Sequence, residues 1–208
     1  MIILDNGLNK KSKNRIHSLY KNVSYRTPDV EKYSKIDLSI TIKELSATYF
    51  KLDIFAFTEY DRIVFIDSDV LVLGDISELF SFSKGDMGAC STYRRKTDSL
   101  EGTINSGVMV LNKPVINNGV YDSLVEEAQK GFSLPDQETI NNIIGPRIVR
   151  LDKKYNMEKR MYKSKKFNWK DAVILHYVSH KPWYKHPPCG RDRGFDELHD
   201  LWRFWYGQ

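Results

Sequence analysis

The segment Ile63-Val64-Phe65-Ile66 is a continuous apolar run, and Asp67, Ser68 and Asp69 follow it directly. A run of this kind is typical of a strand covered on both faces, as in the parallel sheet of an α/β protein. Alternate residues of an extended chain point the same way, so the Asp67 and Asp69 carboxylates can converge at the end of the strand. Open α/β sheets bind ligands at that edge. The segment therefore predicts an α/β fold with a polar site at the edge of a mostly parallel sheet.

Strand-like and helix-like segments alternate along the rest of the chain, which also favours an α/β architecture. We expect further strands at residues 1–4, 108–111 and 172–175. We expect a polar helix that ends near residue 20, and helices at residues 42–58, 75–80, 121–130, 135–144 and 195–206. The spacing of the apolar residues at 42–58 predicts one buried helical stripe with Leu45, Tyr49, Leu52, Phe55 and Ala56. Asp75-Ile76-Ser77-Glu78 has the pattern of a capping box.

The chain has 208 residues, 41% hydrophobic and 28% charged, which is enough apolar material for one folded domain. We predict a single domain over residues 1–208, with a core at 1–184 and an extension at 185–208 that contains the aromatic helix. No uncharged stretch approaches the roughly 20 apolar residues of a membrane span, and the apolar N-terminus is too short for a signal sequence. Cys90 and Cys189 lie far apart in the sequence. They form no metal-binding pair, so we expect a reducing, cytoplasmic location.

The net charge of +5 favours anionic partners without naming them. Basic residues gather at Lys10–Arg15 and at Lys159–Lys166. Runs this short are common on ordinary surfaces, so we predict that both are solvated faces. The sequence contains no recognisable nucleic-acid-binding module, and we predict that the protein binds no nucleic acid.

Two converging carboxylates repel each other unless a cation lies between them, so Asp67 and Asp69 could hold Mg²⁺ or Mn²⁺ together with a diphosphate. The structural alternative is that one carboxylate caps a turn and the other is solvated. His176 follows the expected strand at 172–175 and would lie at the same kind of edge, although it could equally be a packing residue. Lys181, beside Pro182 and Trp183, could neutralise a phosphate or lie in solvent.

Two further segments carry polar side chains, and one of them could contact a sugar. Asn105, Ser106 and Gly107 precede the expected strand at 108–111 and could bind sugar hydroxyls, although they also read as a simple turn. Asp136 and the residues after it begin a helix, where acidic side chains also complement the helix dipole.

The order of these motifs resembles the retaining glycosyltransferases of family 8, the glycogenin-like group. The resemblance covers roughly residues 45–184 and rests on five segments: Tyr60–Leu73, Asn105–Asn112, Asp136-Gln137, Tyr155-Asn156 and His176–Trp183. It implies a GT-A type nucleotide-diphospho-sugar transferase fold, a UDP-sugar donor, a glycan or other hydroxyl acceptor and a divalent cation. The cation would be Mn²⁺, with Mg²⁺ as the alternative. A homodimer is a further possible assembly.

The resemblance also assigns roles to individual residues. It implies a metal site of Asp67, Asp69 and His176, and a donor-phosphate contact from Lys181. It implies that the donor is also contacted by a further set of residues: Lys51, Asp67, Asn105, Ser106, Gly107 and Ser179. It implies that Asp136 holds the donor sugar and is, with Gln137, one of two catalytic residues. It places Gln137 beneath the anomeric carbon, either as an attacking group or as a stabilising one.

The sequence departs from the family pattern at two points. Residues 1–7 resemble the family's second strand, so the resemblance predicts that the first strand and its uridine contacts are lacking, through truncation or through loss of a complete donor site. Ser179 stands where a glycine is common, and the spacing from His176 to Lys181 is the shorter variant, as in plant glucuronyltransferase-like relatives.

Two other functions compete with a glycosyltransferase. A degenerate sugar-nucleotide or glycan-binding domain would keep the fold without turnover. A haloacid-dehalogenase-like phosphatase would use Asp67 as nucleophile and Asp69 as general acid. The phosphatase is the weaker alternative, because the sequence has no Asp-Asp dipeptide and has Leu71 where that family has Thr or Val.

Overall fold

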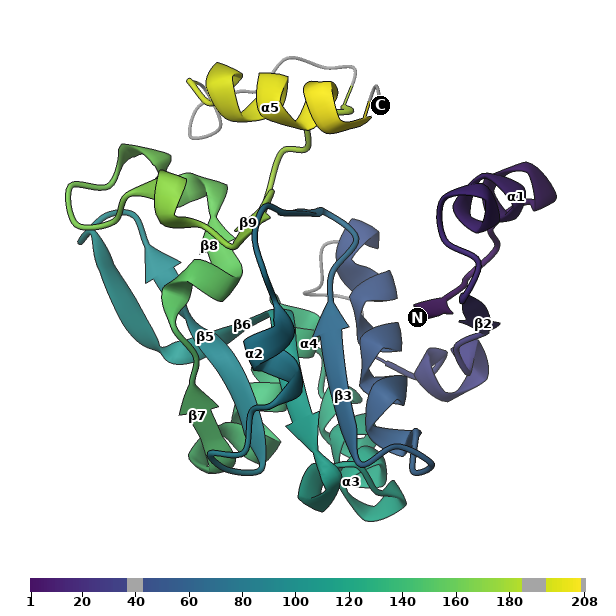
Figure 1. The fold of residues 1–208 in the computed structure, drawn as a ribbon. Helices are drawn as coiled ribbons and strands as arrows, with labels where there is room; N and C mark the ends of the chain where they lie inside the picture. Colours follow the sequence, from purple (N-terminus) through teal and green to yellow (C-terminus); the bar gives the residue numbers. More distant parts are fainter. Residues whose placement is uncertain (37–42, 185–193, 207–208) are drawn as a thin grey trace. The chain divides into compact units, whose positions relative to one another are not determined.

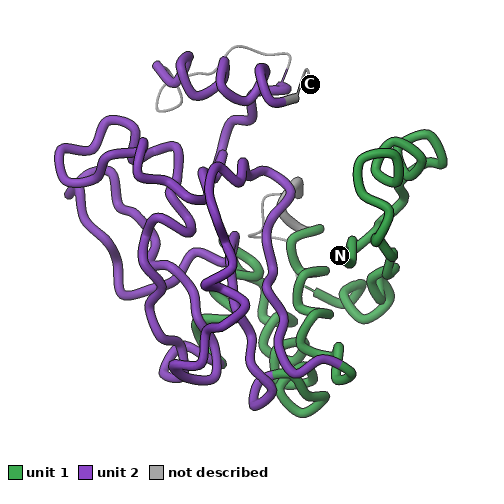
Figure 2. Tube along the Cα trace, in the orientation of Figure 1, with its two compact units in different colours: residues 1–59, 116–143 green, residues 60–115, 144–208 purple. Residues whose placement is uncertain are grey.

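The computed structural model describes residues 1–36, 43–184 and 194–206 (Figure 1). The chain divides into two compact units, one of residues 1–59 and 116–143 and the other of residues 60–115 and 144–208 (Figure 2). Each unit is therefore built from two separate stretches of the chain.

The first unit is mainly helical. Its two short strands, β1 (Ile2–Leu4) and β2 (Ser24–Arg26), pair in parallel. Its helices are α1 (Lys10–Leu19), α3 (Asn118–Ala128) and α4 (Pro135–Ile144), with the 3-10 helices η1 (Val30–Tyr33) and η2 (Lys43–Ala56). Pro135 begins α4 and Gly145-Pro146 ends it, as their backbone preferences predict.

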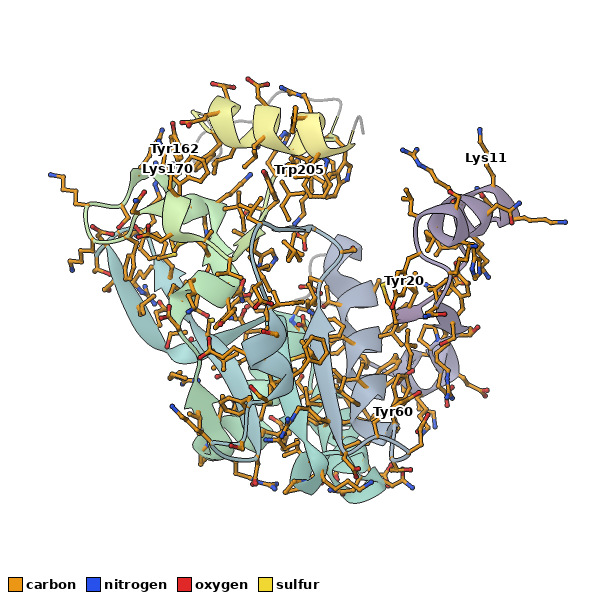
Figure 3. All side chains as sticks on the ribbon, viewed as in Figure 1. Lys11, Tyr20, Tyr60, Tyr162, Lys170 and Trp205 are labelled. Atoms are coloured by element: carbon orange, nitrogen blue, oxygen red, sulfur yellow. The ribbon has the colours of Figure 1, made fainter. Side chains whose placement is uncertain are left out.

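Helix α1 begins where the Asn9 side chain accepts a hydrogen bond from the Ser12 N–H, at 2.9 Å. No residue of α1 is buried, and in Figure 3 the Lys11 side chain projects away from the ribbon. The prediction that Lys10–Arg15 is a solvated face is confirmed.

The core of the first unit lies between η2 and α3. Three residues of the predicted stripe are buried in it: Tyr49, Leu52 and Phe55. Ala56, also predicted to be buried, is only partly buried, and Leu45 lies outside the residues whose side chains are described. The segment is helical, as predicted, but it is a 3-10 helix rather than an α-helix.

The second unit holds two sheets. The larger has the strand order β3 (Arg62–Ile66), β6 (Ser99–Asn112), β5 (Met87–Arg94), β7 (Ile148–Arg150), and the smaller has the order β4 (Val70–Val72), β9 (Ile174–His176), β8 (Met157–Glu158). The helices of this unit are α2 (Ser77–Phe80), η3 (Lys113–Val115), η4 (Gly145–Arg147), η5 (Lys153–Asn156), η6 (Lys159–Lys163), η7 (Trp169–Asp171) and α5 (Asp196–Tyr206). The class is α/β, as predicted.

The strand directions differ from the prediction of a mostly parallel sheet. The β3–β6, β5–β6 and β4–β9 pairs are antiparallel, whereas β5–β7 and β8–β9 are parallel. Strand β3 lies at the edge of its sheet, where Val64 and Ile66 pack on a core that includes Leu79. An apolar run shows that a strand is covered by side chains, and it carries no information about strand direction.

Three local predictions are corrected. Residues 105–107 lie inside β6, where its register against β5 is irregular, and not in a turn before it. Helix α2 forms, but the Glu78 carboxylate accepts a hydrogen bond from Tyr155 in place of closing a capping box. Lys159 is buried although it belongs to a cluster predicted to be solvated: it donates to the His180 carbonyl and lies over the Phe195 ring.

Helix α5 packs on the core of the second unit through one face. Phe195, which precedes it, and Leu198 are buried in a cluster with Tyr177, and Trp202 packs against the same cluster. Trp205, labelled in Figure 3, is exposed. The aromatic helix therefore docks on the core through this face. In the described part of the chain, none of the helices has the length and apolarity needed to cross a bilayer.

Candidate active site

Asp67, Asp69 and His176 come together in the second unit. One ligand atom from each lies within 4.8 Å of the others. His176 Nε2 is 3.3 Å from Asp69 Oδ1 and 4.0 Å from Asp67 Oδ2. Two carboxylate oxygens and an imidazole nitrogen form a mixed ligand set that suits Mn²⁺ better than Mg²⁺. These residues can therefore hold a divalent cation, as the sequence predicts.

Backbone hydrogen bonds hold the three residues in place. The Asp67 N–H donates to the Gly107 carbonyl at 2.8 Å, which ties the end of β3 to β6. The Tyr177 N–H donates to the Asp69 carbonyl at 2.8 Å, and Val70 is paired with His176 in the β4–β9 ladder. The site is thus formed where three strands meet, β3, β4 and β9, with β6 as support.

Lys181 lies beside the same site. Its ammonium forms an ion pair with Asp69 and donates to the Tyr177 carbonyl at 2.8 Å. Burial raises the pKa of Asp69, but its interactions with His176 and with the ammonium of Lys181 outweigh it and hold that pKa well below its usual value. The Asp69 carboxylate is therefore ionised at neutral pH.

The second ring nitrogen of His176, Nδ1, contacts a buried network of side-chain amides. His176 Nδ1 is 2.8 Å from Asn156 Oδ1, and Asn156 Nδ2 donates to Asn105 Oδ1 at 2.8 Å. Asn105 Oδ1 also accepts from the Gly107 N–H at 3.0 Å. Asn105, a predicted donor-sugar contact, thus also supports the imidazole of the metal site.

Gly107 provides the space that the imidazole occupies. A Cβ atom at this position would lie 2.5 Å from His176 Nδ1, far inside contact distance. Any side chain at residue 107 would collide with the His176 ring in its present position. Only glycine leaves room for the ring.

Lys51, Asp136 and Gln137 belong to the first unit. Lys51 Nζ is 2.9 Å from Asp136 Oδ2, and both side chains are buried. Asp136 lies in the first turn of α4 and Gln137 follows it, partly buried. The structure thus pairs the predicted donor contact Lys51 with the predicted sugar contact Asp136.

The remaining predicted site residues differ in exposure. Ser106 is buried in β6, whereas Ser179 is exposed in the loop between β9 and Lys181. Ser179 has a φ of 65°, in the left-handed region where glycine is favoured. This backbone conformation explains why a glycine suits position 179, and the serine adopts it nonetheless.

Asn156 was part of a motif in the sequence, but the residue pattern assigned it no role. It lies just before β8, whose Glu158 is paired with His176 in the β8–β9 ladder. The only sequence signal for a role of Asn156 was its position in a family motif directly before a short strand. Only the paired register of β8 and β9 shows that its side chain reaches His176.

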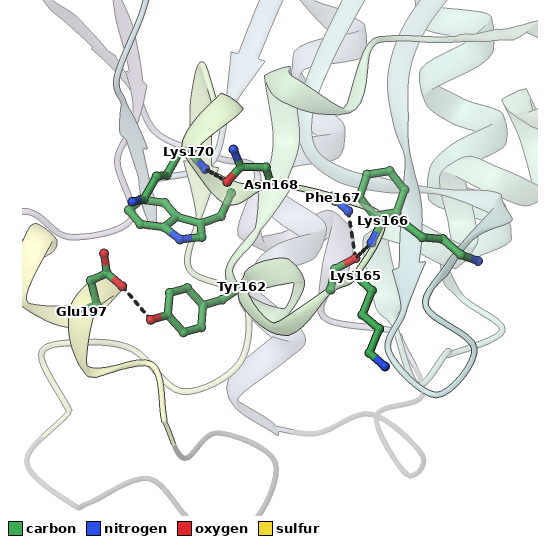
Figure 4. A pocket seen from close by; sticks show the side chains of 9 residues that line it. Tyr162, Lys165, Lys166, Phe167, Asn168, Lys170 and Glu197 are labelled. Carbon is green, nitrogen blue, oxygen red and sulfur yellow. Dashed lines mark hydrogen bonds between the residues drawn. The ribbon is translucent and has the colours of Figure 1, made fainter.

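A separate pocket of about 570 Å³ lies in the second unit between η6, η7 and α5 (Figure 4). Tyr162 and Glu197 face each other across one side, joined by a 2.6 Å hydrogen bond, and Phe167 and Lys170 also line it. It contains none of the predicted site residues, so it is distinct from the Asp67–Asp69–His176 site.

The fold is that of known glycosyltransferases. The galactosyltransferase LgtC, solved in complex with donor and acceptor sugar analogs, superposes with a TM-score of 0.68 at 19% identity, over 96% of this chain and 84% of that one. The predicted GT-A fold class is confirmed.

Sequence relatives point to the same group. Glycogenin-1 of Caenorhabditis elegans is 31% identical over 68% of this chain and 33% of its own length. The UDP-glucuronate:xylan alpha-glucuronosyltransferase 1 of Arabidopsis thaliana is 30% identical over 69% of this chain and 21% of its own length. The chain spans less than half the length of these relatives. Residues 1–186 match the model of glycosyl transferase family 8, and the chain therefore belongs to that family.

Proposed function

We propose that the chain is a metal-dependent retaining glycosyltransferase that moves a hexosyl unit from a UDP-sugar to a glycan or other hydroxyl acceptor. The observation that carries the proposal is the convergence of Asp67, Asp69 and His176, with Lys181 beside them. The name of the Arabidopsis relative includes a UDP-linked sugar, which supports the choice of donor. Family membership argues against the phosphatase alternative.

The residues of the second unit would bind the diphosphate of the donor. A bound Mn²⁺ would supply Lewis-acid stabilisation of the negative charge that develops on the leaving diphosphate. Asp67, Asp69 and His176 would hold that cation. Lys181 would turn its ammonium from Asp69 toward a phosphate oxygen and add a second positive charge at the same point.

In the second unit, the residues Asn105 to Gly107 would contact the donor sugar. The predicted sugar contacts Asp136 and Gln137 belong to the first unit. Asp136 would accept hydrogen bonds from sugar hydroxyls, with Lys51 holding its carboxylate in place. Gln137 would lie beneath the anomeric carbon, and we keep both of its roles, attack and stabilisation of an oxocarbenium-like state. Ser179 would offer a backbone contact to the donor.

Two broader predictions also stay proposals. We keep the single-domain organisation of residues 1–208, with a core at 1–184 and an extension at 185–208. We also keep a cytoplasmic location, which rests on the sequence arguments given above.

Calorimetric titration of UDP with and without Mn²⁺ tests the proposal. We expect Mn²⁺-dependent binding that is lost in Asp69→Ala. The matched control is Asp61→Ala, which removes a carboxylate 96% exposed near the other end of β3 and should bind UDP normally. Turnover is then measured as Mn²⁺-dependent UDP release from a panel of UDP-sugars with glycan acceptors.

Each result has a distinct meaning. Binding with turnover supports the transferase. Binding without turnover on any donor would favour the non-catalytic sugar-nucleotide-binding domain. Equal binding by the wild type and Asp69→Ala, with no effect of Mn²⁺, would refute the proposed metal site.

A further inference from the structure

The amide network behind His176 has a fixed direction. A backbone N–H can only donate, so the 3.0 Å contact from the Gly107 N–H identifies the Asn105 atom as the carbonyl oxygen Oδ1. The Asn156 atom 2.8 Å from that oxygen must then be the donor Nδ2. The orientation of both amides therefore follows from one backbone group whose role is unambiguous.

This direction extends to the imidazole. With Nδ2 turned toward Asn105, Asn156 presents its Oδ1 to His176 Nδ1 at 2.8 Å. A carbonyl oxygen only accepts, so Nδ1 carries a proton, and in the neutral ring Nε2 then keeps the lone pair. That lone pair lies on the side of Asp69 Oδ1, 3.3 Å away, and of Asp67 Oδ2, 4.0 Å away.

Two acceptors compete for the single proton of a neutral His176 ring. Asn156 Oδ1 holds it on Nδ1, whereas the Asp69 carboxylate would attract it to Nε2 and so remove the lone pair that a cation needs. Asn156 is fully buried, and a reversal of its amide would place two carbonyl oxygens, its own and that of Asn105, against each other. Asn156 is therefore locked in the orientation that favours the Nδ1-protonated form.

We propose that Asn156 is a positioning residue that selects the Nδ1-protonated tautomer of His176 and aims Nε2 at the cation site. The metal part of this inference rests on the proposed function, since it assumes that the cation binds between Asp67, Asp69 and His176. The choice of tautomer does not, because it depends only on the network of residues 105, 107, 156 and 176.

Two substitutions separate positioning from simple support of the fold. Asn156→Leu keeps the branched shape and the number of heavy atoms of the side chain and removes both hydrogen bonds. Asn156→Asp removes the donor to Asn105 but keeps an acceptor for His176 Nδ1, as in the carboxylate–histidine pairs that orient metal ligands. A merely structural role would be damaged by both variants, whereas the positioning role survives in the second.

The first readout is the tautomer of His176 in the metal-free protein, from two-bond ¹H–¹⁵N correlation spectra at pH 8, where an ordinary imidazole is neutral. We expect the Nδ1-protonated pattern in the wild type and in Asn156→Asp, and a shift toward the Nε2-protonated pattern in Asn156→Leu. An Nε2-protonated wild type, or an unchanged pattern in Asn156→Leu, would overturn the inference.

The second readout is Mn²⁺ affinity, from the electron paramagnetic resonance signal of the free ion. We expect Asn156→Leu to bind Mn²⁺ about 10–100-fold more weakly than the wild type, and Asn156→Asp to lose much less. Equal affinity in the wild type and Asn156→Leu would contradict the positioning role. A wild type that binds no Mn²⁺ but shows the Nδ1-protonated tautomer would refute the proposed metal dependence and leave the role of Asn156 supported.

Discussion

Each unit of the protein contains a carboxylate cluster, buried in the first unit and partly buried in the second, and the two clusters differ in how their charge is satisfied. In the first unit, Asp53 accepts hydrogen bonds from Tyr33 at 2.5 Å, from Tyr121 at 2.8 Å and from the Asp29 N–H at 2.9 Å. Burial and the hydrogen bond to Asp53 raise the pKa of Tyr33, so the hydroxyls stay neutral donors. This cluster has one negative charge surrounded by donors, and it joins separate segments of the unit.

In the second unit, Asp67 and Asp69 bring two negative charges to one imidazole, and Lys181 contributes one positive charge beside Asp69. Like charges held this close favour a bound cation, whereas a carboxylate surrounded by donors needs no ligand. The comparison shows that burial alone does not identify a functional carboxylate. The number of negative charges that converge on one point is the better indication of a ligand site.

The largest effect is expected from Lys51→Met in the first unit. The substitution leaves Asp136 buried without its ammonium partner, and we expect a loss of about 3–5 kcal/mol in the free energy of unfolding. Urea denaturation measures it, and the double variant Lys51→Met/Asp136→Leu should recover much of the loss. A change below about 1 kcal/mol would mean that the pair is not needed for stability. The Lys51–Asp136 pair would then resemble the Asp67–Asp69 cluster, which is proposed to bind a ligand, more than the Asp53 cluster, which joins segments of the fold.

The next effect concerns Glu158, a buried carboxylate of the second unit that, like Asp53, is surrounded by donors, two of which are cationic. It accepts from the Tyr93 N–H at 2.9 Å and from Lys153 at 3.0 Å, and it pairs with Arg160. Burial raises the pKa of Glu158, but the charges of Lys153 and Arg160 outweigh it and lower that pKa overall. Its stabilising effect is therefore complete above the pKa of the unfolded chain, about 4.3, and is lost as the pH falls through the lower folded value.

We expect Glu158→Gln to destabilise the protein by about 2–3 kcal/mol at pH 7 and to flatten the fall in stability below about pH 4. Urea denaturation at a series of pH values measures both effects. An unchanged slope in acid would show that Glu158 does not contribute to the pH dependence.

A smaller effect is expected from Gly107→Ala in β6. The added Cβ would displace the His176 ring and weaken Mn²⁺ binding about tenfold, which corresponds to about 1.4 kcal/mol. Gly102→Ala is the matched control, because it lies in the same strand and a Cβ there meets no atom within 4 Å. Equal Mn²⁺ affinities in the two variants would mean that the ring position is not needed for the site.

The smallest effect is expected from Ser179→Gly. The residue has a φ of 65°, a conformation that costs a non-glycine residue roughly 1–2 kcal/mol. The glycine also gives the unfolded chain more freedom, so we expect a net gain in stability of about 1 kcal/mol or less. Ser179→Ala should show no gain. If Ser179→Gly were destabilising, the serine side chain would have a role that its exposure does not suggest.

Local sequence signals predicted the elements whose boundaries depend on single residues. Helix α4 covers the predicted residues 135–144, because a proline suits its first turn and Gly145-Pro146 cannot continue it. The pairing of β3 at a sheet edge, the position of residues 105–107 within β6 and the burial of Lys159 were not predictable. They depend on neighbours that are distant in the sequence.

The same division holds for the candidate site. The sequence by itself determined which groups the proposed chemistry would use: two carboxylates in alternate positions after an apolar strand, a histidine at the end of another, and a lysine five residues beyond it. Only the tertiary structure decided how the histidine is oriented, because its ring is held by Asn156, Asn105 and the space at Gly107. Residue type and local spacing determine what a side chain can bind, whereas the direction of a ring nitrogen depends on hydrogen-bond partners that only folding brings together.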